Sequence, residues 1–418
     1  MKNRTILSYP DTLNQIFNKL CQENIRAIIV GGFVRDSLLN KVIKDIDIEV
    51  YGISSFEELE KILKEFGSVN SVGKCFGVCK LSFNGLDLDF SLPRKDNKIA
   101  SGHKGFDIEI DSSLTFKEAT SRRDFTINAI GYDVQEKKIL DPFNGVDDLN
   151  NRILKMVDKK KFSQDPLRVL RAIQFYARFD LRIDSELFTL CVEMIQNNLL
   201  DELPKDRVFG EIKKLILKSQ KPSKGFKLLK EFSGIKYLTP LEQLSNNQFS
   251  KILDSLDYIV SLKTSSNKTN IILMLSVLCS RFDSSQTTLF ISNITDEKEL
   301  LKKILSITQT KLETSYTDTQ LFKLALKVNI EHFLIVQKVI HITKKENYFE
   351  NLKKRALELG ILHQKLKPIL QGRDILEYGI KPSKEYSTIL NEVYEAQMNL
   401  KIKNIKEAKE WLKNYLIP

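Results

Sequence analysis

Two aspartates, Asp45 and Asp47, are the residues of this sequence best placed to do chemistry. They belong to an alternating run over residues 44–50, Lys-Asp-Ile-Asp-Ile-Glu-Val, in which charged and apolar side chains take turns. On a β-strand the side chains at i and i+2 lie on the same face, so both carboxylates would point to one spot. Adjacent carboxylates repel each other unless a cation lies between them, and Mg²⁺ is a hard cation that prefers oxygen ligands. The spacing therefore predicts a Mg²⁺ site.

A glycine pair ahead of the aspartates predicts a turn that can bind phosphate. Residues 27–30 form a short apolar run typical of a buried strand, and Gly31 and Gly32 follow it directly. A turn without Cβ atoms lets a phosphate approach the backbone, and residues 33–39 have the pattern of a helix whose free N–H groups would face the glycines. Each feature alone is more often a plain turn or a solvated strand face. Their combination in one strand–helix–strand unit has the layout of a nucleotidyl-transfer site.

Two further segments carry charged residues that could join this site. Residues 78–83 and 86–92 are alternating runs joined at Asn84-Gly85, a pattern typical of a β-hairpin. Asp87 and Asp89 share a face of the second run, so either could approach the aspartate pair. Arg122 and Arg123 precede an apolar run, and a guanidinium there could bind a triphosphate.

A helix predicted from Ser163 onward carries Asp165, Arg168 and Arg171 along one flank, at i, i+3 and i+6. Ser163 is a good N-cap, and Pro166 suits a first helical turn. An Asp and an Arg one turn apart can form an ordinary surface ion pair. They can also offer a fixed set of donors and acceptors to the edge of a base. The spacing alone leaves both interpretations open.

The elements that position these residues change character along the 418-residue chain. Strand and helix patterns alternate at first, and after about residue 157 the patterns are almost all helical, which predicts an α+β protein with separate domains. We expect a head with a mixed β-sheet over 1–140, followed by a helical neck over 141–215, a helical body over 216–340 and a helical tail over 341–418. Residues 94–113 are polar and contain glycine, and they predict a flexible loop beside the site.

The amino-acid composition indicates which kind of partner the protein binds and in which cellular compartment it works. The net charge of +11 favours a polyanionic partner, nucleic acid ahead of an anionic membrane, although codon bias toward lysine is an alternative cause. Five scattered cysteines, at 21, 75, 79, 191 and 279, have no partners at zinc spacing and fit a reducing cytoplasm. The N-terminus has no apolar signal segment, and the longest apolar run, 271–279, is too short to span a membrane. We therefore expect a cytoplasmic protein.

Five motifs in order resemble one family. The chain is similar to the tRNA nucleotidyltransferases (CCA-adding enzymes) and bacterial poly(A) polymerases, the eubacterial–eukaryotic class of the polymerase beta superfamily. The similarity covers roughly the first 175 residues. The matching segments are GGFVRD at 31–36, DID at 45–47, RRDFTINAI at 122–130, DPFNGVDDL at 141–149 and QDPLRVLRA at 164–172.

The resemblance implies a role for each matching residue. Asp45 and Asp47 would bind catalytic Mg²⁺, and Asp89 would be the third carboxylate in preference to Asp87. The triphosphate would be held by Gly31, Gly32, Arg35 and Arg123. Asp165 and Arg168, with Arg171 nearby, would select CTP or ATP by mimicking base pairing. The reaction would be two-metal attack of an RNA 3′-hydroxyl on the α-phosphate, with release of pyrophosphate.

The resemblance implies addition of C, C and A to tRNA 3′ ends, with tRNA, CTP and ATP as partners and no nucleic-acid template. The alternatives are an enzyme that adds only A, a poly(A) polymerase, and a non-catalytic RNA-binding relative. Two residues depart from the family pattern: Gln164 replaces a Glu, and Gln174 stands where many relatives have an Arg. No His is followed by Asp, so the phosphohydrolase domain that some relatives carry is not expected. The sequence does not predict an oligomeric state.

Overall fold

The computed structural model describes residues 7–41, 45–53, 55–70, 77–98, 106–341, 346–376 and 384–416. The chain divides into two compact units, Met1–Tyr237 and Leu238–Pro418. The first unit contains every strand of the described residues, and the regular elements described in the second unit are all helices. This confirms the predicted α+β class, with a mixed sheet at the N-terminus and helices after it. The finer division into head, neck, body and tail stays a prediction.

A seven-stranded mixed sheet forms the centre of the head, in the order β3-β4-β5-β2-β1-β8-β9. Its central strands β1 and β2 are antiparallel, β2 and β5 are parallel, and β4 and β5 form the hairpin predicted at Asn84-Gly85. The strands are β1 Arg26–Val30, β2 Ile46–Tyr51, β3 Ser68–Asn70, β4 Val78–Phe83, β5 Leu86–Ser91, β8 Gly131–Asp133 and β9 Lys138–Leu140.

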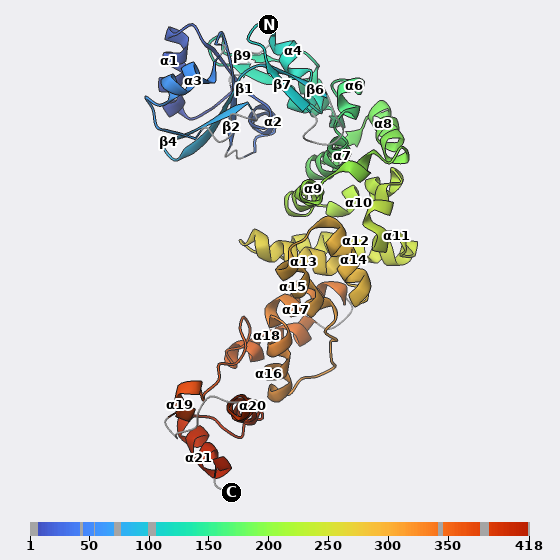
Figure 1. Ribbon diagram of the computed structural model, residues 1–418. Helices are drawn as coiled ribbons and strands as arrows, with labels where there is room; N and C mark the ends of the chain where they lie inside the picture. Colours follow the sequence, from blue (N-terminus) through green and yellow to red (C-terminus); the bar gives the residue numbers. More distant parts are fainter. Residues whose placement is uncertain are drawn as a thin grey trace. The chain divides into compact units, whose positions relative to one another are not determined.

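Amphipathic helices pack against this sheet and build its core (Figure 1). They are α1 Asn14–Gln22, preceded by a 3₁₀ turn at Asp11–Leu13, then α2 Gly32–Leu38 and α3 Phe56–Leu63. Ile16, Phe17 and Leu20 recur at helical spacing and are buried in a cluster with the alternate, inward-facing residues of the strands. The predicted strand–helix–strand unit is therefore present as β1, α2 and β2.

The flexible loop expected over 94–113 is wrong for half of that segment. β6 Arg94–Lys98 and β7 Phe106–Ile110 pair as a separate two-stranded antiparallel sheet, and residues 99–105 lie outside the described residues. Charged residues hid the strand pattern, because Phe106, Ile108 and Ile110 alternate with acidic residues. α4 Phe116–Thr120 and the 3₁₀ turn η3 Thr126–Asn128 follow.

A helical segment completes the first unit. Its elements are α5 Gly145–Asn150, β10 Ile153–Leu154, α6 Lys159–Ser163, α7 Leu167–Phe179, β11 Arg182–Ile183, α8 Ser185–Gln196, η4 Leu199–Glu202, α9 Lys205–Lys218, α10 Pro222–Glu231 and η5 Gly234–Leu238. α9 and α10 both pack on α7. The helix predicted from Ser163 differs in detail. Ser163 ends α6, a short helix capped by Asp158, and α7 begins only after Pro166.

The second unit contains the helices α11 to α21. They are α11 Thr239–Glu242, α12 Asn246–Val260, α13 Asn267–Leu278, α14 Ser284–Ile294, α15 Lys298–Thr308, α16 Asp318–Lys327, α17 Ile330–Ile340, α18 Glu346–Glu358, α19 Gly372–Leu376, α20 Lys384–Met398 and α21 Ile405–Leu416. No helix in the described part of the chain is long and apolar enough to cross a membrane. The cysteines 21, 79, 191 and 279 are free thiols, and Cys75 lies outside the described residues.

Candidate nucleotide-binding and active site

The glycine pair forms a tight turn between β1 and α2. Gly31 has φ +68° and ψ −125°, a backbone conformation that residues with a Cβ rarely adopt. A Cβ atom at Gly31 would lie 2.8 Å from Arg123 Nη1 and 3.7 Å from Asp47 Oδ2. The turn therefore requires glycine for its backbone angles, and glycine also allows the guanidinium of Arg123 to lie against the turn.

Asp47 lies in the middle of the sheet, beside this turn. The register pairs it with Val30, the last residue of β1, and with Asp89 on β5. Because paired residues of neighbouring strands point to the same face, the Asp47 and Asp89 side chains lie on one side. Asp45 directly precedes β2 and is exposed. The register thus places Asp89 rather than Asp87 level with Asp47.

The electrostatics of these carboxylates suit a cation. Partial desolvation raises the pKa of Asp47 above its usual value, the Arg123 charge works against this shift, and the charges of Asp89 and Asp45 add to it. Lys80 Nζ lies 3.1 Å from Asp89 Oδ2 and offsets part of the negative charge. No group of three His, Cys, Asp or Glu residues in the described ranges is close enough to form a complete metal site. The repulsion that Asp89 and Asp45 exert on Asp47 is the kind that a bound cation would relieve.

The two arginines of the 122–130 motif have different surroundings. Arg122 Nη2 lies 3.4 Å from Glu49 Oε2, and the fully buried Glu49 also accepts a hydrogen bond from the Tyr51 hydroxyl. Burial lowers the pKa of Arg123, and its buried Nε has no hydrogen-bond partner among the described residues. A buried guanidinium with an unused donor, next to a glycine turn, fits a bound anion. Glu49 was missed at the sequence level, although it continues the alternation that contains Asp47.

Arg35 is enclosed rather than open to the turn. Its side chain donates to Asn128 Oδ1 at 2.5 Å and to Asp36 Oδ1 at 2.8 Å. Its guanidinium carbon lies 4.6 Å from the centre of the Phe179 ring and 5.1 Å from that of Phe175, both on α7. Arg35 therefore joins α2 of the head to α7 and still lines the cavity described below.

Asp124 and Arg171 form a second link between the motif after α4 and α7. The Arg171 Nη2 and Nε atoms lie 2.6 and 2.7 Å from Asp124 Oδ2, and Asn128 donates to Asp124 Oδ1 at 2.9 Å. Burial alone would raise the pKa of Asp124, but the attraction of Arg171 and the hydrogen bond from Asn128 outweigh it and hold the pKa below its usual value. Arg171 is thus committed to a structural ion pair.

The expected base-reading pair has additional partners. Asp165 Oδ2 lies 3.3 Å from Arg207 Nη2 on α9. Arg168 donates from Nη1 to the Lys161 carbonyl at 2.9 Å and from Nη2 to the Arg122 carbonyl at 2.5 Å. These contacts hold both side chains in fixed orientations beside the head motif.

A cavity of about 410 Å³ brings the predicted residues together. It is lined by six arginines and three aspartates, a surplus of positive charge that suits a nucleoside triphosphate. The lining consists of Gly31, Gly32, Arg35, Asp47, Arg122, Arg123, Asp124, Asn128, Asp165, Leu167, Arg168, Arg171, Phe175 and Arg207. Of the predicted site residues, Asp45 and Asp89 are not part of this lining. Sequence reasoning missed Asp124, Asn128, Phe175 and Arg207. The first two lie inside a motif that pointed to the site, whereas no local pattern marks Arg207.

Comparison with known proteins gives two family matches and a set of named relatives. Residues 27–155 match the poly A polymerase head domain, and residues 180–242 match the probable RNA and SrmB-binding site of polymerase A. The chain is 35% identical over 217 residues to the multifunctional CCA protein of Methylobacillus flagellatus, and 36% identical over 219 residues to the CCA-adding enzyme of Buchnera aphidicola subsp. Schizaphis graminum. Over these segments the chain is therefore similar to the CCA-adding enzymes and poly(A) polymerases.

The matched region spans 52% of this chain and about half the length, 50%, of each of these two relatives. Solved structures of the family resemble the chain over a longer stretch. The CCA-adding enzyme of Bacillus stearothermophilus in complex with CTP has a TM-score of 0.74 at 22% identity and covers 97% of this chain and 98% of its own. That of Thermotoga maritima complexed with tRNA has a TM-score of 0.63 at 22% identity, covering 99% and 97%. At this identity the likeness establishes the fold.

Proposed function

We propose that this protein adds C, C and A to the 3′ ends of tRNA from CTP and ATP, without a nucleic-acid template. The observation that carries the proposal is the cavity in which Asp47 and the Gly31 turn meet Asp165 and Arg168. A phosphate-binding turn and a pair of side chains suited to a base edge thus share one hollow. The relatives named CCA-adding enzymes support this choice of reaction over A addition alone.

We assign the two ends of the nucleotide to two sets of residues. Gly31, Gly32 and Arg123 bind the triphosphate, supported by the close approach that the turn allows and by the buried Nε of Arg123. Asp165 and Arg168 read the base, because they combine a carboxylate acceptor with a guanidinium donor in fixed orientations. Arg35 and Arg171 also line the cavity. Arg35 connects α2 with α7 through the Phe175 and Phe179 rings, and Arg171 connects α7 with Asp124 through an ion pair.

Mg²⁺ is the proposed cofactor, held by Asp45 and Asp47 with Asp89 alongside. When bound, the ion lowers the pKa of the attacking RNA 3′-hydroxyl and stabilises the charge of the pyrophosphate leaving group. The protein orients the α-phosphate by gripping the other two phosphates at the glycine turn. Lys80 holds the Asp89 carboxylate in place through its 3.1 Å contact.

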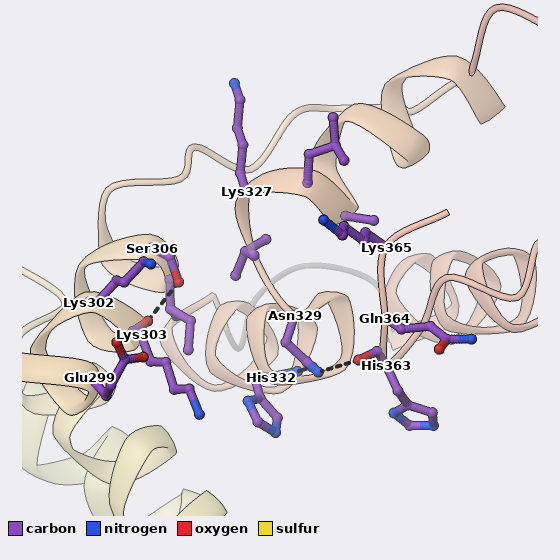
Figure 2. Close-up of a pocket in the computed structure, with 14 residues that line it drawn as sticks. Glu299, Lys302, Lys303, Ser306, Lys327, Asn329, His332, His363, Gln364 and Lys365 are labelled. Carbon is purple, nitrogen blue, oxygen red and sulfur yellow. Dashed lines mark hydrogen bonds between the residues drawn. The ribbon is translucent and has the colours of Figure 1, made fainter. Parts of the chain in front are cut away.

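The proposed tRNA partner is supported by charge. The chain has a net charge of +11. The second unit has a hollow of about 410 Å³ with four lysines in its lining, contributed by α15, by the end of α16 and by the segment after α18 (Figure 2). The lysines are Lys302, Lys303, Lys327 and Lys365. Lysines that line one hollow can contact the phosphates of an RNA backbone. The cytoplasmic location stays a prediction from the cysteine content.

A primer-extension experiment tests the proposal. The full-length protein is incubated with tRNA transcripts that lack CCA, or that end in CC, with CTP and ATP supplied separately and together. We expect growth by three nucleotides from the first transcript and by one from the second. Growth from the CC end alone would indicate A addition, long tails would indicate poly(A) synthesis, and binding without growth would indicate a non-catalytic protein. Asp47→Asn should abolish growth while tRNA affinity stays near that of the wild type.

A further inference from the structure

Two residues of α9 hold side chains of the nucleotide site from a helix that lies outside the sequence motifs. Arg207 and Glu211 are four positions apart and therefore lie on one face of α9, which packs along α7. Arg207 Nη2 lies 3.3 Å from Asp165 Oδ2, and Glu211 Oε1 lies 3.9 Å from Arg171 Nη1. One helical face thus contacts an acidic and a basic residue of the cavity.

The Asp165 carboxylate is held on both of its oxygens. Oδ1 accepts a hydrogen bond from the backbone N–H of Leu167 at 3.2 Å, and Oδ2 faces Arg207. Both side chains line the cavity, and both are mostly covered, with exposed fractions of 21% for Asp165 and 32% for Arg207. The contact of Oδ2 with Arg207 therefore restrains rotation of the Asp165 carboxylate about its Cβ–Cγ bond.

We propose that Arg207 is a positioning residue for base selection, which acts by holding the Asp165 carboxylate toward the incoming base. The inference rests on the proposed function. The exocyclic amines of cytosine and adenine donate hydrogen bonds, whereas uracil and guanine present an oxygen acceptor at the corresponding place. A carboxylate kept in one orientation accepts a hydrogen bond from the amines and repels the oxygens. If the carboxylate could rotate, it would accept hydrogen bonds from water instead, and the preference for cytosine and adenine over uracil and guanine would fall.

A direct role of Arg207 on the triphosphate is the competing interpretation, because the residue lines the same cavity. The two roles have different kinetic consequences. A phosphate contact affects all four nucleotides alike, since they share the triphosphate. Loss of a positioning contact changes the ratio of kcat/KM between nucleotides. It causes only a small fall in kcat/KM that is common to all of them.

The test uses the full-length protein, a tRNA primer that lacks CCA, and CTP or UTP. We expect Arg207→Met to lower the ratio of kcat/KM for CTP over UTP about tenfold, with Tm and tRNA affinity close to the wild type. Arg207→Lys should retain part of the ratio. Lys213→Met is the matched control, because Lys213 lies on the same helix over the Phe209 ring, and its loss changes the net charge equally. An equal rise in KM for CTP and UTP, with an unchanged ratio, would overturn the proposal.

A double-mutant cycle with Asp165→Asn tests the route of the effect. If Arg207 acts through Asp165, Arg207→Met should not lower the ratio further in the Asp165→Asn protein, whereas additive losses would refute that route. Calorimetric titration with CTP and UTP separates this result from the proposed function. If the wild type fails to extend tRNA but prefers CTP, and Arg207→Met removes that preference, the positioning role stands and the activity assignment falls. If the wild type binds CTP and UTP equally, the positioning role is wrong.

Discussion

The two carboxylates of β5, Asp87 and Asp89, have different hydrogen-bond partners. Asp89 is level with Asp47 and contacts Lys80 at 3.1 Å. Asp87, two residues earlier on the same strand, accepts a hydrogen bond from Ser82 at 3.0 Å. Sequence alone left the choice between Asp87 and Asp89 to the family resemblance, whereas the parallel register of β2 and β5 adds a physical reason to favour Asp89.

Substituting each of these aspartates tests the choice. Asp89→Asn removes the charge that lies beside Asp47, and we expect it to lower kcat for tRNA extension about 10- to 100-fold. Asp87→Asn serves as the matched control on the same strand and should stay within about twofold of the wild type. Both are measured in the extension assay at saturating CTP and ATP. A larger loss for Asp87→Asn would reverse the assignment.

The buried ion pair of Asp124 with Arg171 should make stability depend on pH. The pKa of Asp124 is held below its ordinary value of 3.8, so the folded state binds the proton less readily than the unfolded state. This contribution to stability is fully present above pH 3.8 and is lost as the pH falls through the lower folded pKa.

Asp124→Asn leaves Arg171 without its main counter-charge, and we expect it to cost about 3 kcal/mol of unfolding free energy at neutral pH. Urea titrations of wild type and variant between neutral and acid pH measure the difference, which should shrink as the carboxylate of the wild type is protonated. A difference that stays constant down to the lowest pH at which the wild type folds would contradict the assigned pKa direction.

At the scale of elements, the site depends on the Gly31 turn and on the contact between two helices. These are α2 in the head and α7 in the helical segment that follows it. The Gly31 turn needs a positive φ, and Arg123 fills the space where a Cβ would be. Helix α2 reaches α7 through Arg35, whose guanidinium lies over the Phe179 ring and beside Asp36. The place of Arg123 at the turn and the contact of Arg35 with α7 do not follow from the secondary-structure pattern, although the turn and α2 were both predicted.

Gly31→Ala should damage the site more than the fold. The new Cβ would lie 2.8 Å from Arg123 Nη1, and the side-chain end can move away, but it then leaves its place beside the turn. We expect a loss of about 1–3 kcal/mol in unfolding free energy from backbone strain, together with a rise in KM for both CTP and ATP. Gly85→Ala is a control with φ +76° and open space around it. It should cost stability but leave KM unchanged.

Arg35→Met separates the link between α2 and α7 from any contact with the nucleotide. Methionine keeps apolar contact with the Phe175 and Phe179 rings but loses the hydrogen bonds to Asp36 and Asn128, so we expect a loss of about 3 kcal/mol in stability. Arg178→Met is the matched control, because Arg178 stacks on Phe179 at 4.6 Å and lies 3.5 Å from Asp36 but is not part of the cavity lining. A rise in KM for CTP with Arg35→Met alone would support the predicted triphosphate contact. Equal KM values for the two variants would favour a structural role.

At the scale of the whole molecule, the positive charge extends through both units. The arginine-lined cavity belongs to the first unit and the lysine-lined hollow to the second. Contacts between lysines and phosphates release counterions, so their contribution is read from the dependence of affinity on salt.

Replacing Lys302 and Lys303 with Gln should weaken tRNA binding and reduce its salt dependence. We expect the slope of log K against log salt to fall by about 0.9 for each phosphate contact that is lost. Lys251→Gln with Lys268→Gln changes the net charge equally, with exposed lysines that do not line this hollow. Filter binding over a range of salt concentrations measures both slopes. The same loss in both proteins would assign the effect to net charge rather than to the hollow.

Local patterns in the sequence were enough to predict the Gly31 turn, the strand that carries Asp47, the Asn84-Gly85 hairpin and the order of a mixed head followed by helices. Such features depend on neighbours a few residues apart, so they are visible in any short window. The two-stranded sheet of β6 and β7 was missed for a related reason, because its apolar alternation is weak beside its many charges.

Only the tertiary structure decided which partners the site residues have. Asp165 contacts Arg207, 42 residues further along the chain, and Arg35 contacts Asn128, 93 residues away. Pairings of this kind follow from the packing of α9 against α7 and of α2 against η3, and no periodicity in the sequence encodes them. The types and spacing of the charged residues were enough to predict a nucleotide site. The packing of helices distant in sequence determined which of those charges are neutralised by ion pairs and which remain available to a nucleotide.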